Sequence, residues 1–200
     1  MKVAGLIVAA GLSSRMKDFK PMMQIGNQTI IKRVILTLKE AGATPIVVIT
    51  GFKADELEES LKDIDVICLR NNKYATTQMF DSVKIGLEYL EDRCDTVLFT
   101  PGDIPLFSLE SVRQLLESGE KLAKPVCNGK GGHPLLIDSS FIDSILACNK
   151  DGGLKAALQE LDLSVKKIEV RDKGVLLDAD TKQDFENLVS FYKSKNFREL

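Results

Sequence analysis

Residues 3–21 read VAGLIVAAGLSSRMKDFKP, and the architecture of the whole chain can be worked out from this stretch. Its first part, residues 3–9, is an apolar run with three β-branched side chains, which is typical of a buried strand. Small residues, two serines, an arginine and two lysines follow at once. In open α/β sheets, ligands bind beyond the carboxyl ends of the strands. The stretch therefore predicts a strand with a ligand-binding loop at its end.

Apolar runs and helical patterns alternate along the chain that follows. Apolar, β-branched runs predict buried strands at residues 46–50, 66–69 and 96–100. Apolar residues at helical spacing predict helices at residues 30–41, 54–62, 76–91 and 108–118, the last with Ser108 as its N-cap. Strands that alternate with helices predict an α/β fold, in which a mostly parallel mixed sheet is covered on both faces.

The last third of the chain departs from this regular alternation, because its predicted strands are short and closely spaced. Short strands are predicted at residues 123–126, 134–137, 165–170 and 175–177, and helices at residues 141–148 and 154–161. Thr181 and Asp184 have the spacing of a capping box, which predicts a last helix that runs to about residue 193. Because no linker or repeat divides the chain, we expect one domain over residues 1–194 and a frayed tail over residues 195–200.

The composition narrows the classes of function. The 200 residues include 27 Lys and Arg against 29 Asp and Glu, which gives a net charge of -2. We therefore expect neither nucleic acid nor a membrane as a partner through bulk charge. The apolar run at the N-terminus is too short to span a membrane and lacks a signal-peptide layout, so a cytoplasmic location is expected. His133 is the only histidine, so catalysis must rely mainly on carboxylates, lysine, arginine and backbone groups.

The loop after the first strand suits a polyphosphate. The small residues Ala9, Ala10 and Gly11 let the backbone approach a ligand closely. Backbone N–H groups combined with fixed cations are the donors that phosphate groups need. The pattern matches neither the Walker A phosphate loop nor the GxGxxG motif. Hydroxyls and cations are supplied by Ser13, Ser14, Arg15, Lys17 and Lys20.

Two acidic segments follow predicted strands and are candidates for a metal site. Asp103 lies in the sequence PGDIP, where two prolines and a glycine hold it rigidly. Asp178 and Asp180 alternate in the sequence LDADT, so on an extended backbone they share a face. Magnesium takes one or two protein carboxylates together with phosphates and water. Asp103 is a candidate for the first Mg²⁺ ligand, or else it caps the turn before the helix at Ser108. One of the other two aspartates is a candidate for the second ligand, or else both belong to the turn and the start of the last helix.

Two further segments carry groups that can contact a substrate. Residues 71–78 read NNKYATTQ and offer amide and hydroxyl groups that can read the edge of a nucleobase. They lead into the predicted helix that carries Ser82. Residues 128–134 read NGKGGHP, which either encloses a ligand or forms a simple hairpin turn.

These motifs together resemble the molybdenum cofactor nucleotidyltransferase family. The run VAAGLSSRM at residues 8–16, with Lys20 after it, resembles the signature loop, and PGDIP, GGHPLLI and LLDADT follow in the family's order. The resemblance extends over residues 3–191. It implies a Rossmann-like three-layer α/β/α domain that binds an NTP with Mg²⁺ and transfers a nucleoside monophosphate to a phosphorylated acceptor. The Ala-Ala-Gly form resembles the cytidylyltransferases, so CTP is favoured, with molybdopterin as the favoured acceptor.

The resemblance also implies roles for individual residues. Arg15, Lys20 and Asp103 are the expected catalytic set, in which the two cations hold the triphosphate. Asp103 binds the metal, and Asp180, or else Asp178, provides the second ligand. Gly132 and His133 are expected at the acceptor. The expected nucleotide-binding residues are Ala9, Ala10, Gly11, Ser13, Ser14, Arg15, Lys20, Asn72 and Ser82.

Several alternatives remain open at this point. The acceptor can be a sugar phosphate or a phosphorylated alcohol, and a molybdopterin acceptor implies a molybdoenzyme maturation partner. From another class comes a glycosyltransferase with an Asp-x-Asp metal site at residues 178–180. A non-catalytic nucleotide-binding protein is favoured only by Lys17, which stands where the family usually has glycine. Gln78 likewise replaces a common glycine, next to the expected base site.

Overall fold

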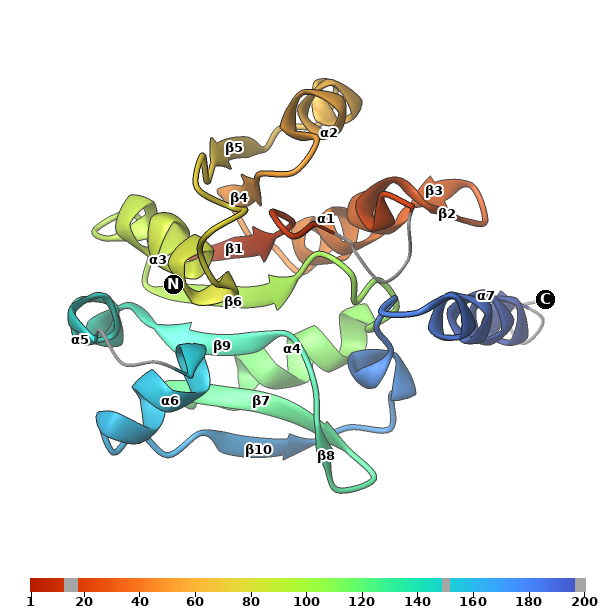
Figure 1. Ribbon diagram of the computed structural model, residues 1–200. Helices are drawn as coiled ribbons and strands as arrows, with labels where there is room; N and C mark the ends of the chain where they lie inside the picture. The colour runs from red at the N-terminus through yellow and green to blue at the C-terminus, as the bar shows by residue number, and fades with distance from the viewer. Residues whose placement is uncertain (13–17, 149–151, 197–200) are drawn as a thin grey trace.

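The computed structural model describes residues 1–12, 18–148 and 152–196 (Figure 1). A central sheet of eight strands has helices packed on both faces, so the predicted α/β fold with three layers is confirmed. Within these described ranges, no helix combines the length and the apolar character that a membrane span requires.

One half of the sheet is parallel and is centred on the first strand. β1 (Val3–Val8) is buried along its whole length and lies between two parallel neighbours, β4 (Ile46–Thr50) and β6 (Thr96–Pro101). β5 (Ile67–Arg70) extends this half beyond β4, again in parallel. The buried run predicted at residues 3–9 is therefore the middle of the sheet.

The other half of the sheet is mixed. β9 (Leu135–Asp138) runs antiparallel to both β6 and β7 (Leu122–Cys127), so β6 and β7 point the same way. β10 (Lys166–Glu169) is parallel to β7 at the edge, and the short β8 (Lys130–Gly131) pairs with β7. The carboxyl ends of β1, β6, β7 and β10 consequently lie along one edge of the sheet, as Figure 1 shows.

Helices cover the two faces with separate apolar cores. On one face pack α1 (Ile30–Glu40), α2 (Ala54–Leu61) and α4 (Leu109–Glu117). The opposite face is covered by α3 (Met79–Leu90), α5 (Ile142–Ala147) and α6 (Gly153–Glu160). Close packing of α3 on β1 depends on Gly86, since a Cβ atom there would overlap the Leu6 side chain. This packing fixes the N-terminus of α3 beside the end of β1.

The C-terminal helix packs against a small separate hairpin. The 3₁₀ helix η1 (Lys20–Met22) leads into β2 (Gln24–Ile25) and β3 (Gln28–Thr29). A third apolar cluster, which includes Ile25 and Leu188, joins this hairpin to α7 (Lys182–Asn196). Two more 3₁₀ helices, η2 (Ser139–Phe141) and η3 (Lys173–Leu176), lie in the mixed half.

Two predicted helix starts are confirmed by their hydrogen bonds. Ser108 caps α4, because its Oγ accepts a hydrogen bond from the Ser111 backbone N–H at 3.2 Å. The Thr181 backbone N–H donates to Asp184 Oδ2 at 2.9 Å, and the Asp184 N–H donates to Thr181 Oγ1 at 3.2 Å. These reciprocal bonds are the capping box predicted at the start of α7.

Three predicted boundaries are wrong. The strand expected at residues 175–177 is the 3₁₀ helix η3, because the Asp172 side chain accepts the Gly174 N–H and turns the chain. The helix expected from residue 76 begins at Met79, since the Gln78 N–H is capped by Asp81 Oδ2 at 2.7 Å. The last helix, expected to run to about residue 193, extends to Asn196, and Lys195, which was expected in a frayed tail, belongs to α7 and pairs with Asp172. Residues 197–200 lie outside the described part.

Candidate active site

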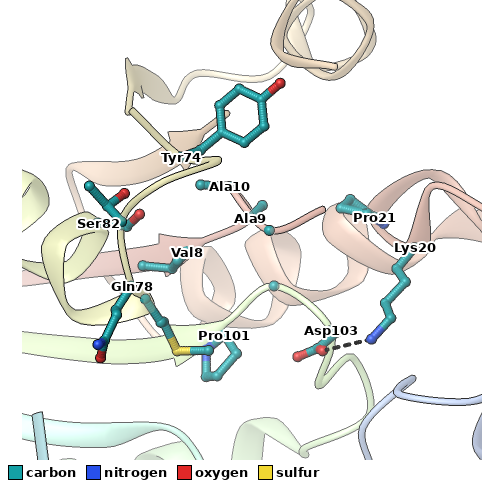
Figure 2. A pocket seen from close by; sticks show the side chains of 14 residues that line it. Val8, Ala9, Ala10, Lys20, Pro21, Tyr74, Gln78, Ser82, Pro101 and Asp103 are labelled. Atoms are coloured by element: carbon teal, nitrogen blue, oxygen red, sulfur yellow. Dashed lines mark ion pairs between the residues drawn. The ribbon is translucent and has the colours of Figure 1, made fainter. Parts of the chain in front are cut away.

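A cavity of about 170 Å³ lies at the carboxyl ends of the two central strands (Figure 2). The ends of β1 and β6 form its floor, and η1 and the segment that enters α3 contribute further walls. Among the residues expected at the nucleotide, Ala9, Ala10, Gly11, Lys20 and Ser82 line it, and so does the expected metal ligand Asp103. The strand-end positions therefore meet at one site, as the sequence predicts.

Small residues let the chain segments at the floor lie close together. The Ala9 N–H donates to the Ile49 carbonyl at 2.9 Å, which holds the backbone beyond the end of β1. A Cβ atom on Gly51 would lie 2.8 Å from the Ala10 carbonyl oxygen, and the Gly102 N–H donates to the Val8 carbonyl at 2.8 Å. Ser13, Ser14, Arg15 and Lys17, which the sequence places in the same loop, lie outside the described residues.

Lys20 connects two acidic segments that are far apart in the sequence. Its side chain is 11% exposed, and its Nζ lies 2.8 Å from Asp180 Oδ1 and 3.7 Å from Asp103 Oδ2. Figure 2 shows the Lys20 side chain pointing to Asp103 from η1. Opposite charges at this distance attract strongly where water is partly excluded. The expected cation and both expected carboxylates thus form one cluster.

The carboxylates of this cluster repel one another. Burial raises the pKa of Asp103, the positive charge of Lys20 lowers it, and the negative charge of Asp180 raises it again, so that it lies above its ordinary value. Burial also raises the pKa of Asp178, and the charges of Asp180, Asp103 and Asp184 add to the effect. Because the ionised carboxylates destabilise one another, a cation bound beside them would stabilise their charged form.

The cluster fits a divalent metal ion. Two carboxylates from separate segments converge on one cationic position, which the Lys20 ammonium occupies. Magnesium is usually held by one or two protein carboxylates and completes its shell with phosphate oxygens and water. In the part of the chain that the structure describes, no group of three or more metal-ligating side chains occurs. Asp103 and Asp180 could hold a divalent ion whose remaining ligands are phosphate oxygens and water.

One expected nucleotide-binding residue is not at the cavity. Asn72 is exposed and does not line it, whereas its neighbour Asn71 is buried. The Asn71 Nδ2 donates to Ser82 Oγ at 3.0 Å and to Thr77 Oγ1 at 2.9 Å. Asn71 thus holds two residues of the cavity wall in place. The buried amide of this segment is therefore that of Asn71, whereas Asn72 lies away from the cavity.

The expected acceptor residues are packed against η3 and do not line the cavity. A Cβ atom on Gly132 would overlap the Val175 carbonyl oxygen, so glycine is required there by packing. The His133 N–H donates to the same carbonyl at 3.0 Å, and its ring meets Phe99 edge-on with centroids 5.9 Å apart. Burial lowers the pKa of His133 to about 4, so the imidazole is neutral at pH 7. Its buried Nδ1 has no hydrogen-bond partner among the described residues.

Two residues of the cavity wall belong to the polar segment at residues 71–78 but were not among the expected nucleotide-binding residues. Tyr74 and Gln78 line the cavity, and both lie between β5 and α3. The Tyr74 ring is 6.3 Å from the Phe52 ring, which in turn meets Phe19 edge-on at 5.8 Å. A polar segment after a buried strand was the only signal for them, and it does not tell which side chains turn inward.

Comparison with known proteins reveals extensive similarity in sequence. The family model described as the MobA-like NTP transferase domain matches residues 5–165. Molybdenum cofactor cytidylyltransferase of Escherichia coli is 28% identical over 183 residues, which cover 90% of this chain and 92% of that relative. Bifunctional protein GlmU of Staphylococcus epidermidis is 28% identical over 168 residues, which are 81% of this chain and 35% of GlmU. This chain thus matches about a third of the length of GlmU.

The fold is shared with solved structures. A nucleotidyl transferase from Methanothermobacter has a TM-score of 0.83 at 20% identity, with 97% of this chain and 99% of that chain covered. The family match includes the end of β1, Lys20 and Asp103, and the shared fold extends over the C-terminal third as well. From this match and this fold we conclude that the protein belongs to the MobA-like NTP transferase family and is a nucleotidyltransferase.

Proposed function

We propose that this nucleotidyltransferase transfers CMP from CTP to a phosphorylated acceptor, with molybdopterin favoured, and releases pyrophosphate. The observation that carries the proposal is the convergence of Lys20, Asp103 and Asp180 beside a cavity lined by the small residues that follow β1. An oxygen of the acceptor phosphate attacks the α-phosphorus of CTP. The bond from that phosphorus to the oxygen bridging the α- and β-phosphates breaks, and pyrophosphate leaves with the electron pair.

The residues of the cluster address the main barrier to this reaction. Two anions must approach each other, and fixed cations offset their repulsion. Lys20 provides one such cation at the cavity, and Arg15 is proposed as another from the same loop. Asp103 and Asp180 would hold Mg²⁺, which when bound neutralises charge on the phosphate oxygens. The acceptor phosphate is already largely dianionic at pH 7, because its second pKa is about 6, so no general base is required.

Two observations support CTP as the donor. The Ala-Ala-Gly form of the loop is the one that resembles the cytidylyltransferases, and the decisive Ala10 is buried at the cavity floor. The relative from Escherichia coli, which is matched over nearly its full length, is named a cytidylyltransferase. Thr77, Gln78 and Ser82 line the same cavity and offer hydroxyl and amide groups that can hydrogen-bond to a small pyrimidine base.

The proposed acceptor is supported by the same relative and by the arrangement of the strands in the mixed half of the sheet. The carboxyl ends of β7 and β10 lie along the edge that carries the cavity, so the mixed half is available for an acceptor. Molybdopterin is favoured by the name of the Escherichia coli relative. We propose hand-over to a molybdoenzyme maturation partner as its consequence. A sugar phosphate or a phosphorylated alcohol is the second proposal for the acceptor.

A screen of donors and acceptors tests the proposal. Pyrophosphate release is measured with each of the four NTPs, with and without Mg²⁺, against molybdopterin, a sugar 1-phosphate and a phosphorylated alcohol. We expect metal-dependent release only with CTP and molybdopterin. Release with another NTP would overturn the base assignment, and release only with a sugar phosphate would overturn the acceptor.

A further inference from the structure

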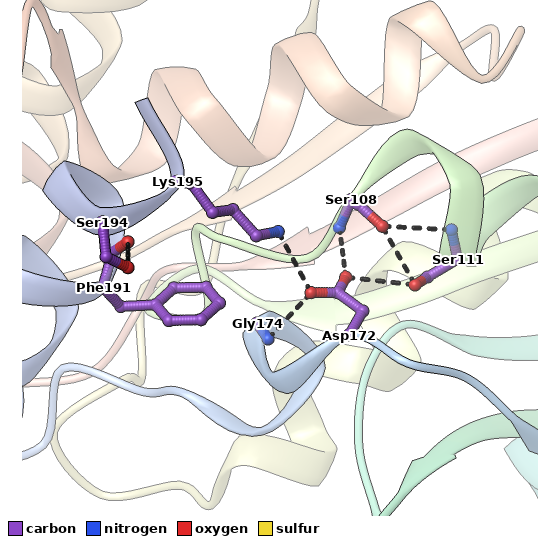
Figure 3. Close-up of polar contacts among 7 residues, drawn as sticks. All are labelled: Ser108, Ser111, Asp172, Gly174, Phe191, Ser194 and Lys195. Carbon is purple, nitrogen blue, oxygen red and sulfur yellow. Dashed lines mark hydrogen bonds and ion pairs between the residues drawn. The ribbon is translucent and has the colours of Figure 1, made fainter. Parts of the chain in front are cut away.

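A buried carboxylate lies outside the cavity and joins three segments of the chain (Figure 3). The Asp172 side chain is 7% exposed. One of its oxygens accepts the Ser108 backbone N–H at 2.6 Å and the Ser111 hydroxyl at 3.0 Å. The other accepts the Gly174 backbone N–H at 3.0 Å and the Lys195 ammonium at 3.2 Å. Four donors from α4, η3 and α7 thus meet on one carboxylate.

The segments that Asp172 joins are the ones that carry the two candidate metal ligands. Residues 103–108 and residues 172–180 run side by side in opposite directions. At one end the Ala179 N–H donates to the Asp103 carbonyl at 3.0 Å. In the middle Gly174 packs on the Leu106 carbonyl so closely that a Cβ atom would overlap it. At the other end Asp172 accepts the Ser108 N–H.

The electrostatics of Asp172 favour a fixed, ionised group. Burial alone would raise its pKa, but the hydrogen bond from the Ser108 N–H and the positive charge of Lys195 outweigh that effect and hold it below its ordinary value. Hydrogen bonds to an ionised acceptor are roughly twice as strong as neutral ones. The carboxylate therefore fixes residue 174 relative to residue 108, and so the path of the chain from residue 174 to Asp180.

We propose that Asp172 is a positioning residue for nucleotidyl transfer. It holds the segment of Asp180 against that of Asp103, so that the two carboxylates keep the separation a small divalent ion requires. The inference rests on the proposed function, in which these two aspartates hold Mg²⁺. Mg²⁺ demands near-ideal octahedral geometry, whereas Ca²⁺ accepts a flexible shell of 6–8 oxygens. Loss of Asp172 should therefore affect the two ions unequally.

Calorimetric titration of the acceptor-free protein tests this directly. Dissociation constants are measured for CTP with Mg²⁺, with Ca²⁺ and with EDTA, in wild type and Asp172→Asn. We expect Asp172→Asn to weaken binding of Mg²⁺·CTP about tenfold, as losses of residues that orient metal ligands do. Binding of Ca²⁺·CTP should weaken at most about twofold, and binding of CTP in EDTA should not change. Equal losses in all three titrations, or none, would overturn the proposal.

Two variants keep the test decisive if Asp172→Asn does not fold. Lys195→Met removes the ammonium donor and leaves the carboxylate, and we expect about a threefold loss for Mg²⁺·CTP only. Ser111→Ala removes one hydroxyl donor and should change every constant less than about twofold. Equal constants for Lys195→Met and wild type would overturn the proposal. A wild type that binds CTP equally with and without metal would instead contradict the proposed function.

Discussion

Lys20 and Asp180 are separated by 160 residues in sequence, yet Lys20 Nζ lies 2.8 Å from Asp180 Oδ1. The same ammonium lies 3.7 Å from Asp103 Oδ2. One cation from η1 therefore joins the segment after β6 to the segment after η3. The pair shows how the N-terminal loop and the C-terminal third contribute to one site.

Removal of the Lys20 ammonium should strengthen metal binding and weaken nucleotide binding. In Lys20→Met, two carboxylates lose a nearby positive charge, and attraction between opposite charges at about 4 Å is large in a partly buried site. We expect Mn²⁺ alone to bind about tenfold more tightly than to wild type, whereas CTP in EDTA binds about tenfold more weakly. Electron paramagnetic resonance of free Mn²⁺ and calorimetry with CTP measure the two effects.

Lys20→Arg is the matched control, because it keeps the charge and changes only its shape. It should bind Mn²⁺ alone about as weakly as wild type. Weaker binding of both Mn²⁺ and CTP by Lys20→Met would contradict the assignment, since it would indicate a collapsed site.

Protonation of His133 should make the free energy of unfolding depend on pH, whereas the catalytic rate should not depend on it. Its folded pKa of about 4 lies below the ordinary 6.5, since burial and the charge of Lys124 lower it more than a hydrogen bond to the Phe99 carbonyl raises it. The unfolded chain therefore binds a proton first, and stability falls as pH drops from about 6.5 towards 4. Urea unfolding measures how much unfolding free energy the protein loses between pH 7 and pH 5. We expect this loss to be smaller in His133→Asn than in wild type, by up to about 2 kcal/mol. An unchanged slope would contradict the neutral, buried imidazole.

Gly132 should be required by packing against η3. Gly132→Ala places a methyl group on the Val175 carbonyl, so η3 or the β8–β9 turn must shift. Overpacking of this kind costs about 1–3 kcal/mol of unfolding free energy. Gly11→Ala, where a Cβ would meet nothing within 4 Å, should change stability by less than about 0.5 kcal/mol. Thermal and urea unfolding of both variants measure the difference, and equal stabilities would refute the requirement.

The sequence was informative wherever the strand-end rule applied. A buried parallel strand must end at the sheet edge, so residues 9–11, Lys20 and Asp103 could be assigned to one site from the sequence alone. The alternation of strands and helices sufficed for the three layers. The motif LDADT led to Asp180 although the apolar segment before it, which was expected to be a strand, is the 3₁₀ helix η3.

Other features depend on contacts between distant segments, which local patterns do not contain. Asn71 rather than Asn72 supports the cavity, since burial after β5 depends on where α3 packs. The apolar residues 175–177 have the pattern of a strand, but the side chain of Asp172 turns them into η3. Lys195 has the local pattern of a tail residue. Its partner in the structure is Asp172, 23 residues earlier, and a local pattern does not reveal such a contact.

The most direct test of the central claim is the metal dependence of pyrophosphate release by Asp103→Asn. The amide keeps the size of the side chain and removes its charge, so the fold and the binding of CTP in EDTA should be retained. We expect Mg²⁺-dependent pyrophosphate release to fall at least about 10³-fold, because charge stabilisation at the reacting phosphates is the main contribution to catalysis. Turnover by Asp103→Asn at the wild-type rate, with the same half-saturating Mg²⁺, would contradict the account.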